Sequence, residues 1–312
     1  MKAILKSVSR SFYLTIRWLP RPLREPVALA YLLARATDTI ADTAAIPALT
    51  RLTMIREVSQ TIAGELDFAA IADRLRQFAR QQTDSAERTL IESLRAILQR
   101  LDKLPASDRA DVREVLQTIV KGQQLDLDHF GDPGKPGRLR TAAELEEYTY
   151  LVAGCVGEFW TGLGFRHFAK FATLSPNEMT RLGIEYGKGL QLINILRDRH
   201  ADLANGRDYL PAEELAGAPL TEVFQCWLQE AEEQVRCGLD YCSSLTTWRL
   251  RFATVLPALI GLRTIFYLRA AGPAAEKVKV PRREVRQLLV AALMASASPK
   301  RLRAFCASLP AR

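Results

Sequence analysis

Apolar residues recur every three or four positions along most of the chain, with charged residues between them. The segments ADVREVLQTIVKGQQLDLDHF (110–130) and PRREVRQLLVAALMASA (281–297) are examples, and strict alternation of apolar and polar residues is rare. A period near 3.6 residues is typical of amphipathic helices, whereas half-buried strands alternate with a period of two. The pattern therefore predicts an all-α fold.

Capping and breaking signals predict where several of these helices begin. The clearest signals are prolines before an apolar helix, a Thr and Glu at capping-box spacing, and a Ser-Pro pair. They occur at Pro22 and Pro26 before VALAYLLARATDTIAD (27–42), at Thr141 with Glu144, and at SPNEM (175–179).

One segment, FGDPGKPGRLR (130–140), interrupts the helical pattern sharply. Three Gly and two Pro within 11 residues cannot continue a helix. We expect a loop or flap near residues 130–140.

Composition narrows the class of protein. The 312 residues are 48% hydrophobic, which allows a large buried core, and the length alone suggests about two domains. Five cysteines without a CxxC pair argue against a disulfide framework or a thiolate zinc site and favour a reducing compartment. The net charge of +8 favours an anionic partner, but the basic residues are spread out without interleaved aromatics, so we expect no nucleic-acid binding.

Charged residues also argue against a signal peptide and a transmembrane helix. Lys6, Arg10 and Arg17 interrupt the apolar N-terminal stretch, and the uncharged run FATVLPALIGL (252–262) is too short to span a bilayer. We expect a soluble or peripheral protein.

Two pairs of aspartates stand four residues apart, at Asp38 with Asp42 and at Asp198 with Asp202. Positions i and i+4 share one helix face, where two like charges cost roughly 0.2–0.5 kcal/mol unless a cation lies between them. Neighbouring arginines on a solvated face could neutralise one such pair. The first pair, however, continues an apolar stripe, and two pairs that each stand beside an arginine offer the hard oxygens and guanidinium groups that Mg²⁺ and a diphosphate require.

Four motifs resemble the squalene and phytoene synthases, enzymes that join two prenyl diphosphates head to head. They are SRSF (9–12), DTIAD (38–42), YTYLVAGCVG (148–157) and RDRHAD (197–202) with GRDYLP (206–211), in the family's order. The resemblance spans about residues 7–290. It implies a class I isoprenoid-synthase fold, a single-domain helical bundle over residues 1–312 whose central cavity takes two farnesyl or geranylgeranyl chains. Two aspartate pairs about 160 residues apart can share metal ions only if both helices line one cavity, which also favours one domain.

Matched residue by residue, the resemblance implies several sets of site residues. The resemblance implies that Asp38, Asp42, Asp198 and Asp202 bind the metal ions and are catalytic. It implies that Tyr148 acts in the first half-reaction. Diphosphate binding falls to Arg10, Arg35 and Arg197. The cavity would be lined by Phe12, Tyr31, Val152, Gly154, Gln191 and Asn194, with Tyr150, Phe159 and Trp160 as further aromatics. NADPH would contact Ser9, Asn194, Arg197, Lys279 and Arg282. The small residues Ala153, Gly154 and Gly157 would let chains or helices approach closely.

The implied reaction joins two farnesyl diphosphates to presqualene diphosphate with two or three Mg²⁺ ions, followed by NADPH-dependent reduction to squalene. Phytoene or dehydrosqualene synthase, which lose a proton instead, and a presqualene diphosphate synthase stay open as alternatives. A member that has lost catalysis and serves as a scaffold is the alternative from another class, but such a protein has no reason to keep all four aspartates and their arginines.

The same resemblance implies a location. Because the product is apolar, we expect a cytoplasmic protein that can contact the inner face of the cell membrane peripherally, through basic and apolar surface that includes the basic tail 299–312. The sequence does not indicate an oligomeric state.

Overall fold

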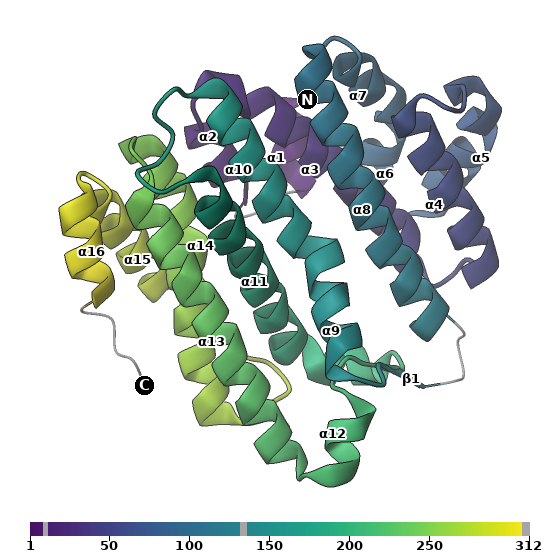
Figure 1. Cartoon of the computed structure of the whole chain (residues 1–312). Helices are drawn as coiled ribbons and strands as arrows, with labels where there is room; N and C mark the ends of the chain where they lie inside the picture. The colour runs from purple at the N-terminus through teal and green to yellow at the C-terminus, as the bar shows by residue number, and fades with distance from the viewer. Residues whose placement is uncertain (9–11, 132–135, 308–312) are drawn as a thin grey trace. The chain divides into compact units, whose positions relative to one another are not determined.

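The structure is a computed structural model that describes residues 1–8, 12–131 and 136–307 (Figure 1). Helices make up nearly all of its regular structure, which confirms the predicted all-α fold class. The chain divides into two compact units, Met1–Asp132 and Pro133–Arg312. The single-domain organisation expected from the family stays a prediction.

The first unit is entirely helical in its described part. Its longest helices, α3 and α8, pack against each other, and α4 packs against both. The elements are α1 (Lys2–Val8), α2 (Phe12–Trp18), α3 (Arg21–Asp42), α4 (Ala48–Ala63), α5 (Phe68–Gln81), α6 (Ser85–Glu92), α7 (Leu94–Leu101) and α8 (Ala106–Phe130).

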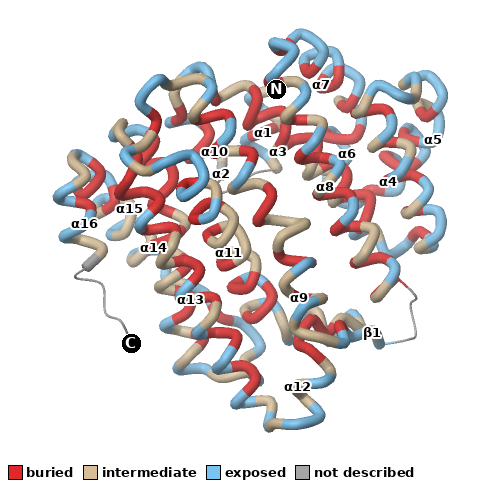
Figure 2. Tube along the Cα trace, viewed as in Figure 1, coloured by how far each residue is buried: buried red, intermediate tan, exposed pale blue. Residues whose placement is uncertain are grey.

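Helix α3 carries the first aspartate pair at its C-terminal end. The apolar stripe before that pair is fully buried, because Leu29, Leu32, Leu33 and Ala36 have no exposed surface. Buried residues are red in Figure 2. Beyond the end of α3, the buried Arg51 of α4 donates to the carbonyl oxygens of Ala41 and of Ile46, the former through a short contact and the latter at 2.9 Å. The bond to Ala41 satisfies a carbonyl group at the C-terminal end of α3, where the helix itself supplies no partner, and the bond to Ile46 ties down the loop before α4.

The predicted helix starts are correct with two adjustments. Helix α11 begins at Pro176 with Ser175 and Glu178 in a full capping box. At Thr141 the hydroxyl accepts from the Glu144 amide at 3.1 Å, but the Glu144 carboxylate accepts from the Arg140 amide instead of from Thr141. Helix α3 begins before its prolines, at Arg21, so Pro26 lies inside it. Pro26 is past the first turn, so it removes the backbone hydrogen bond that a residue there would donate to the carbonyl of Pro22.

The second unit is built around α11, which packs against α10, α13 and α14. Its helices are α9 (Ala142–Thr149), the π-helical turn η1 (Tyr150–Gly154), α10 (Cys155–His167), α11 (Pro176–Ala204), α12 (Ala212–Gly217), α13 (Leu220–Ser244), α14 (Trp248–Ala271), α15 (Arg282–Ala295) and α16 (Pro299–Ala307). Its two short strands are β1 (Gly137–Arg138) and β2 (Arg207–Asp208).

Glycines let α10 and α11 cross with their backbones in contact. A Cβ atom on Gly157 would lie 1.9 Å from the carbonyl oxygen of Gly183, and one on Gly187 would lie 2.3 Å from that of Ala153. Real Cβ atoms do not approach a carbonyl oxygen this closely, so no larger residue fits without a shift of one helix. The expectation that small residues at 153–157 permit close helix approach is confirmed.

The strands β1 and β2 form a minimal parallel sheet that the all-α pattern did not indicate. Gly137 pairs with Arg207, and Arg138 with Asp208. The pairing joins the segment before α9 to the segment after α11, so two stretches about 70 residues apart are held together directly after the second aspartate pair.

Helix α14 is, within the described residues, the one helix long and apolar enough to cross a membrane by length and composition. Of its most apolar 18-residue window, 67% is buried inside the structure, against α11, α13 and α15. A core helix of a soluble protein passes the same test, and a helix that is apolar all round is expected in a core.

Candidate functional site

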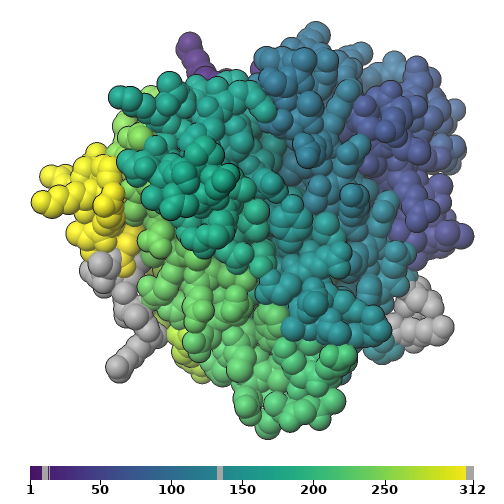
Figure 3. Space-filling view, viewed as in Figure 1, coloured from purple at the N-terminus to yellow at the C-terminus, as the bar shows by residue number. Residues whose placement is uncertain are grey.

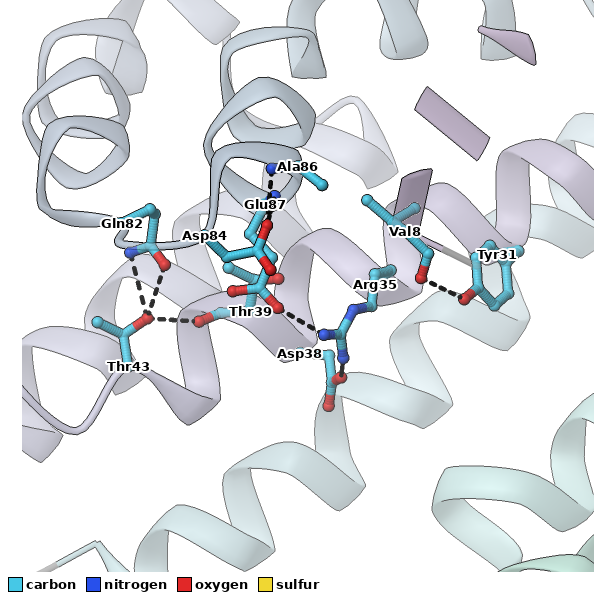
Figure 4. A network of polar contacts seen from close by, with 10 residues as sticks. All are labelled: Val8, Tyr31, Arg35, Asp38, Thr39, Thr43, Gln82, Asp84, Ala86 and Glu87. Atoms are coloured by element: carbon cyan, nitrogen blue, oxygen red, sulfur yellow. Dashed lines mark hydrogen bonds and ion pairs between the residues drawn. The ribbon is translucent and has the colours of Figure 1, made fainter. Parts of the chain in front are cut away.

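The first aspartate pair lies within a network of ion pairs on α3 and α6 (Figure 4). The Arg35 guanidinium lies between two carboxylates: its Nη1 is 2.5 Å from Asp38 Oδ2, and its Nη2 is 2.6 Å from Glu87 Oε1. One turn earlier, Tyr31 donates to the carbonyl oxygen of Val8 at 3.2 Å, which attaches α3 to α1. The ion pairs with Asp38 and Glu87 hold the Arg35 guanidinium beside the first aspartate pair.

The surroundings of Asp38 disfavour its ionised form. The Asp38 side chain keeps 42% of its surface exposed. Even so, desolvation by the surrounding helices and the like charge of Asp42 raise its pKa to about 7, against the opposing effect of Arg35. The carboxylate of Asp126 on α8 adds to the same rise in the pKa of Asp38. A bound cation would stabilise the ionised form of such a group.

The second aspartate pair lies near the C-terminal end of α11. Arg197 forms a bidentate ion pair with Asp198, with Nε 2.8 Å from Oδ1 and a shorter contact between Nη2 and Oδ2. The hydrogen bond to Asp198 raises the pKa of Arg197, and the charge of Asp202 raises it further. Asp198 is 49% exposed, so this ion pair can exchange partners with a bound ligand at little cost.

Asn194 lies one turn and Gln191 two turns before Asp198 on α11. The Asn194 side-chain amide donates to Gln191 Oε1 at 3.4 Å. Both side chains are partly or fully exposed, in contrast to the buried Leu192, Ile193 and Ile195 between and beside them. The polar face of α11 therefore continues from Gln191 to the aspartate pair.

The two pairs suit a metal that takes only part of its ligands from protein. Within the described ranges, no three His, Cys, Asp or Glu side chains form a closed metal cluster. Mg²⁺ commonly binds one or two carboxylates and completes its octahedron with water and substrate phosphates. Two carboxylates at i and i+4 beside an arginine match that donor set, and the arginine can pair with a diphosphate oxygen.

Tyr148, at the end of α9, is buried and stacks on the buried Tyr209 directly after β2. The ring centroids are 5.1 Å apart with an interplanar angle of 25°. The residue before Tyr209, Asp208, is also buried and accepts from Arg138 at 2.7 and 3.0 Å. Arg199 of α11 lies 3.4 Å from the same carboxylate. Asp208 thus links β1 to α11, and its neighbour fixes the ring of Tyr148.

The stack predicts an energetic coupling between Tyr148 and Tyr209. In a double-mutant cycle of Tyr148→Leu and Tyr209→Leu, followed by urea unfolding, we expect a coupling of about 1 kcal/mol, as found for stacked aromatic pairs. A control cycle of Tyr209→Leu with Tyr267→Leu, whose ring contacts Phe266, should be additive. A coupling of zero in the first cycle would show that the stack does not hold the two rings.

The other site residues expected from the family resemblance occupy different settings. Val152 and Gly154 lie in the π-helical turn η1, and a Cβ on Gly154 would lie 3.2 Å from Lys188 Cγ of α11. Lys279 precedes α15 and Arg282 begins it, and both are exposed cations of the kind that pair with phosphate groups. Ser9 and Arg10 lie outside the described residues, and Phe12 is the first residue of α2.

The structure adds residues that sequence reasoning missed. Glu87 shares Arg35 with Asp38, Asp126 adds its charge beside Asp38, and Asp208 with Tyr209 supports the second unit's site. The sequence contains a pattern that could have identified Asp126. It continues the buried stripe of α8 that includes Leu116 and Ile119, in the same way that Asp38 continues the buried stripe of α3. The others depend on contacts between distant segments.

The chain belongs to the squalene/phytoene synthase family, which it matches over residues 5–284. It is 29% identical over 211 residues to a squalene synthase of Saccharomyces cerevisiae, covering 67% of this chain and 44% of that protein. It is 28% identical over 218 residues to a phytoene synthase of Mycobacterium tuberculosis, covering 69% and 57%. The alignments thus span less than two thirds of the length of these curated relatives.

Solved structures share the fold at lower identity. The complex of TcSQS with the ligand E5700 has a TM-score of 0.73 at 22% identity, covering 97% of this chain and 88% of that one. A dehydrosqualene synthase in complex with a ligand has a TM-score of 0.64 at 22% identity, covering 98% and 95%. At this identity the likeness shows the fold alone.

Proposed function

We propose that this protein condenses two farnesyl diphosphates head to head to presqualene diphosphate and then converts this intermediate to squalene with NADPH. The observation that carries the proposal is the repeated arrangement on α3 and α11, where two aspartates at i and i+4 accompany an arginine already ion-paired with one of them. Membership of a family that includes squalene and phytoene synthases supports the condensation.

In this proposal each acidic pair holds Mg²⁺, Asp38 with Asp42 and Asp198 with Asp202. The bound metal would stabilise the negative charge that develops on the departing diphosphate. Arg35 and Arg197 exchange their present carboxylate partners for diphosphate oxygens, which guanidinium groups can bind in a bidentate manner. Arg10 would be a third diphosphate ligand.

The aromatic residues act on the organic part of the substrate. Loss of diphosphate leaves an allylic cation, which the face of a tyrosine ring can stabilise through its negative quadrupole. Tyr148 is the first candidate, because its burial excludes water that would quench the cation and its stack on Tyr209 holds the ring in one orientation. The cation adds to the double bond of the second farnesyl diphosphate, and loss of a proton closes the cyclopropane of presqualene diphosphate.

The second stage decides the product. Presqualene diphosphate would lose its remaining diphosphate and rearrange to a second cation. NADPH, when bound, would supply a hydride to this cation; without that hydride the cation would lose a proton. Hydride transfer gives squalene and NADP⁺, whereas proton loss gives dehydrosqualene, or phytoene from geranylgeranyl diphosphate. Lys279 and Arg282 are the exposed cations that we assign to the NADPH phosphates, with Ser9, Asn194 and Arg197 as further contacts.

Product analysis tests this proposal. We expect purified full-length protein with farnesyl diphosphate and Mg²⁺ to release diphosphate and, in gas chromatography–mass spectrometry, to give squalene only when NADPH is present. Dehydrosqualene in both samples, or presqualene diphosphate alone, would move the assignment to the corresponding branch of the family. No turnover of either farnesyl or geranylgeranyl diphosphate would contradict the condensation itself.

A further inference from the structure

Lys and Arg occur along the whole chain, but its net positive charge comes from the C-terminal end, where acidic residues do not balance them. Residues 277–312 contain nine Lys and Arg but a single acidic residue, so their net charge equals the +8 of the whole chain. The preceding 276 residues are therefore neutral on balance. This segment includes α15 and α16, which pack against each other, and α16 forms the yellow part of the surface in Figure 3.

Helix α15 exposes apolar side chains on the face that also carries this charge. Val290 is 54% exposed, Leu293 45% and Met294 63%. At 100° per residue, these three fall with the exposed Arg283 and Arg286 in one arc of about 100°. We call this set of five residues the α15 stripe. It is basic in the first half of the helix and apolar in the second.

The opposite side of α15 attaches the helix to the protein. Ala292 and Ala295 are buried. Glu284, the single acidic residue of this region, accepts from Arg263 Nε and from the Tyr267 hydroxyl of α14, both at 2.5 Å. The Glu284 carboxylate is thus paired on the side of α15 that faces α14, and the α15 stripe contains no negative charge. Its exposed apolar residues are not needed to hold α15 in place.

We propose that the α15 stripe is a docking surface for an anionic lipid bilayer. Helices that lie in a membrane interface combine Lys or Arg with large apolar residues on the face that meets the lipid, and binding strengthens with both the buried apolar area and the anionic lipid content. Lys300, Arg301 and Arg303 of the neighbouring α16 are exposed and add to the attraction. The proposal locates the expected membrane contact mainly on α15 and does not depend on the reaction that the protein catalyses.

The charge distribution favours a bilayer over a second copy of this chain. A two-fold dimer contact through the α15 stripe would place the same basic segment of both copies at one interface, and the repulsion would oppose association. An anionic bilayer instead offers negative charge over the whole face and an apolar interior into which Val290, Leu293 and Met294 can insert.

Vesicle binding by the full-length protein tests the proposal. We expect wild-type protein to cosediment with phosphatidylcholine vesicles that contain phosphatidylglycerol, to bind pure phosphatidylcholine much more weakly, and to dissociate as salt is raised. The variant V290S/L293S/M294S and the variant R283Q/R286Q should each lower the partition coefficient about tenfold or more. The matched control L49S/R56Q/R80Q removes one apolar and two basic exposed side chains from the first unit and should bind like wild type.

A second measurement needs no variant. Hydrogen–deuterium exchange of wild-type protein with and without anionic vesicles should show added protection at residues 283–297 and little change in α4 and α5. Protection elsewhere, or vesicle binding by both stripe variants equal to that of the control, would overturn the proposal. It would also be overturned if the serine variant lost a wild-type dimer in light scattering while no form of the protein bound vesicles, because the stripe would then be a protein interface.

Discussion

Replacing Asp198 with asparagine is expected to lower diphosphate release from farnesyl diphosphate by about a thousandfold or more, which corresponds to roughly 4 kcal/mol of transition-state stabilisation. The substitution removes the anionic oxygen from the proposed metal site and leaves the amide a weak ligand for Mg²⁺. It also removes the carboxylate partner of Arg197. Asp38→Asn should have an effect of the same size on the first pair.

The fold should tolerate both substitutions. Each removes one of two like charges at i and i+4, which relieves a repulsion, and the raised pKa of Asp38 shows that its ionised form is already disfavoured. The melting temperature should therefore stay within about 2 °C of wild type. Asp240→Asn, at an exposed aspartate of α13, is the matched control for the rate. Near-normal turnover in either site variant, measured at saturating Mg²⁺, would refute the metal assignment for that pair.

Replacing Gly157 with alanine should destabilise the protein by about 3 kcal/mol, at the upper end of typical overpacking effects. The added Cβ would lie 1.9 Å from the carbonyl oxygen of Gly183, and backbone atoms cannot move aside as a flexible side chain can. Helices α10 and α11 would have to separate. At 100° per residue, Gly183 shares a face of α11 with Asn194 and Asp198, so the shift would act on the face that carries them. We expect a lower urea midpoint with an unchanged m-value.

Gly162 provides the control on the same helix. It is exposed, and a Cβ there would meet nothing within 4 Å. Gly162→Ala should therefore stabilise the protein slightly, by up to about 1 kcal/mol, because alanine is the better helix former. Equal effects of the two substitutions would mean that the close crossing of α10 and α11 does not limit the fold.

Local geometry explains what could be predicted from the sequence. The 3.6-residue period identified the helices, and the spacing of Asp38 with Asp42 and of Asp198 with Asp202 follows from one turn of a helix whatever surrounds it. The ion pairs of Arg35 with Asp38 and of Arg197 with Asp198 join residues at most three positions apart. Such contacts need no knowledge of the tertiary fold.

The parts of the site that could not be predicted depend on long-range packing. Arg35 and Glu87 are 52 positions apart, and Arg138 and Asp208 are 70 apart. No periodicity connects such residues, because their distance depends on how helices and strands from different parts of the chain pack. The sheet of β1 and β2 was missed for the same reason: two-residue strands leave no detectable alternation in the sequence.

The π-helical turn η1 has a consequence for how this protein can tolerate insertions and deletions. A π-turn corresponds to one residue added to an α-helix, so side chains before it are rotated by about 100° relative to those after it. Tyr148 lies just before this turn, and Gly157, which fixes the crossing with α11, lies just after it. The direction of the Tyr148 ring is therefore determined by the number of residues in 150–154 as well as by their identity. A change in length of one residue here would turn the ring away from Tyr209 even if every remaining side chain were kept.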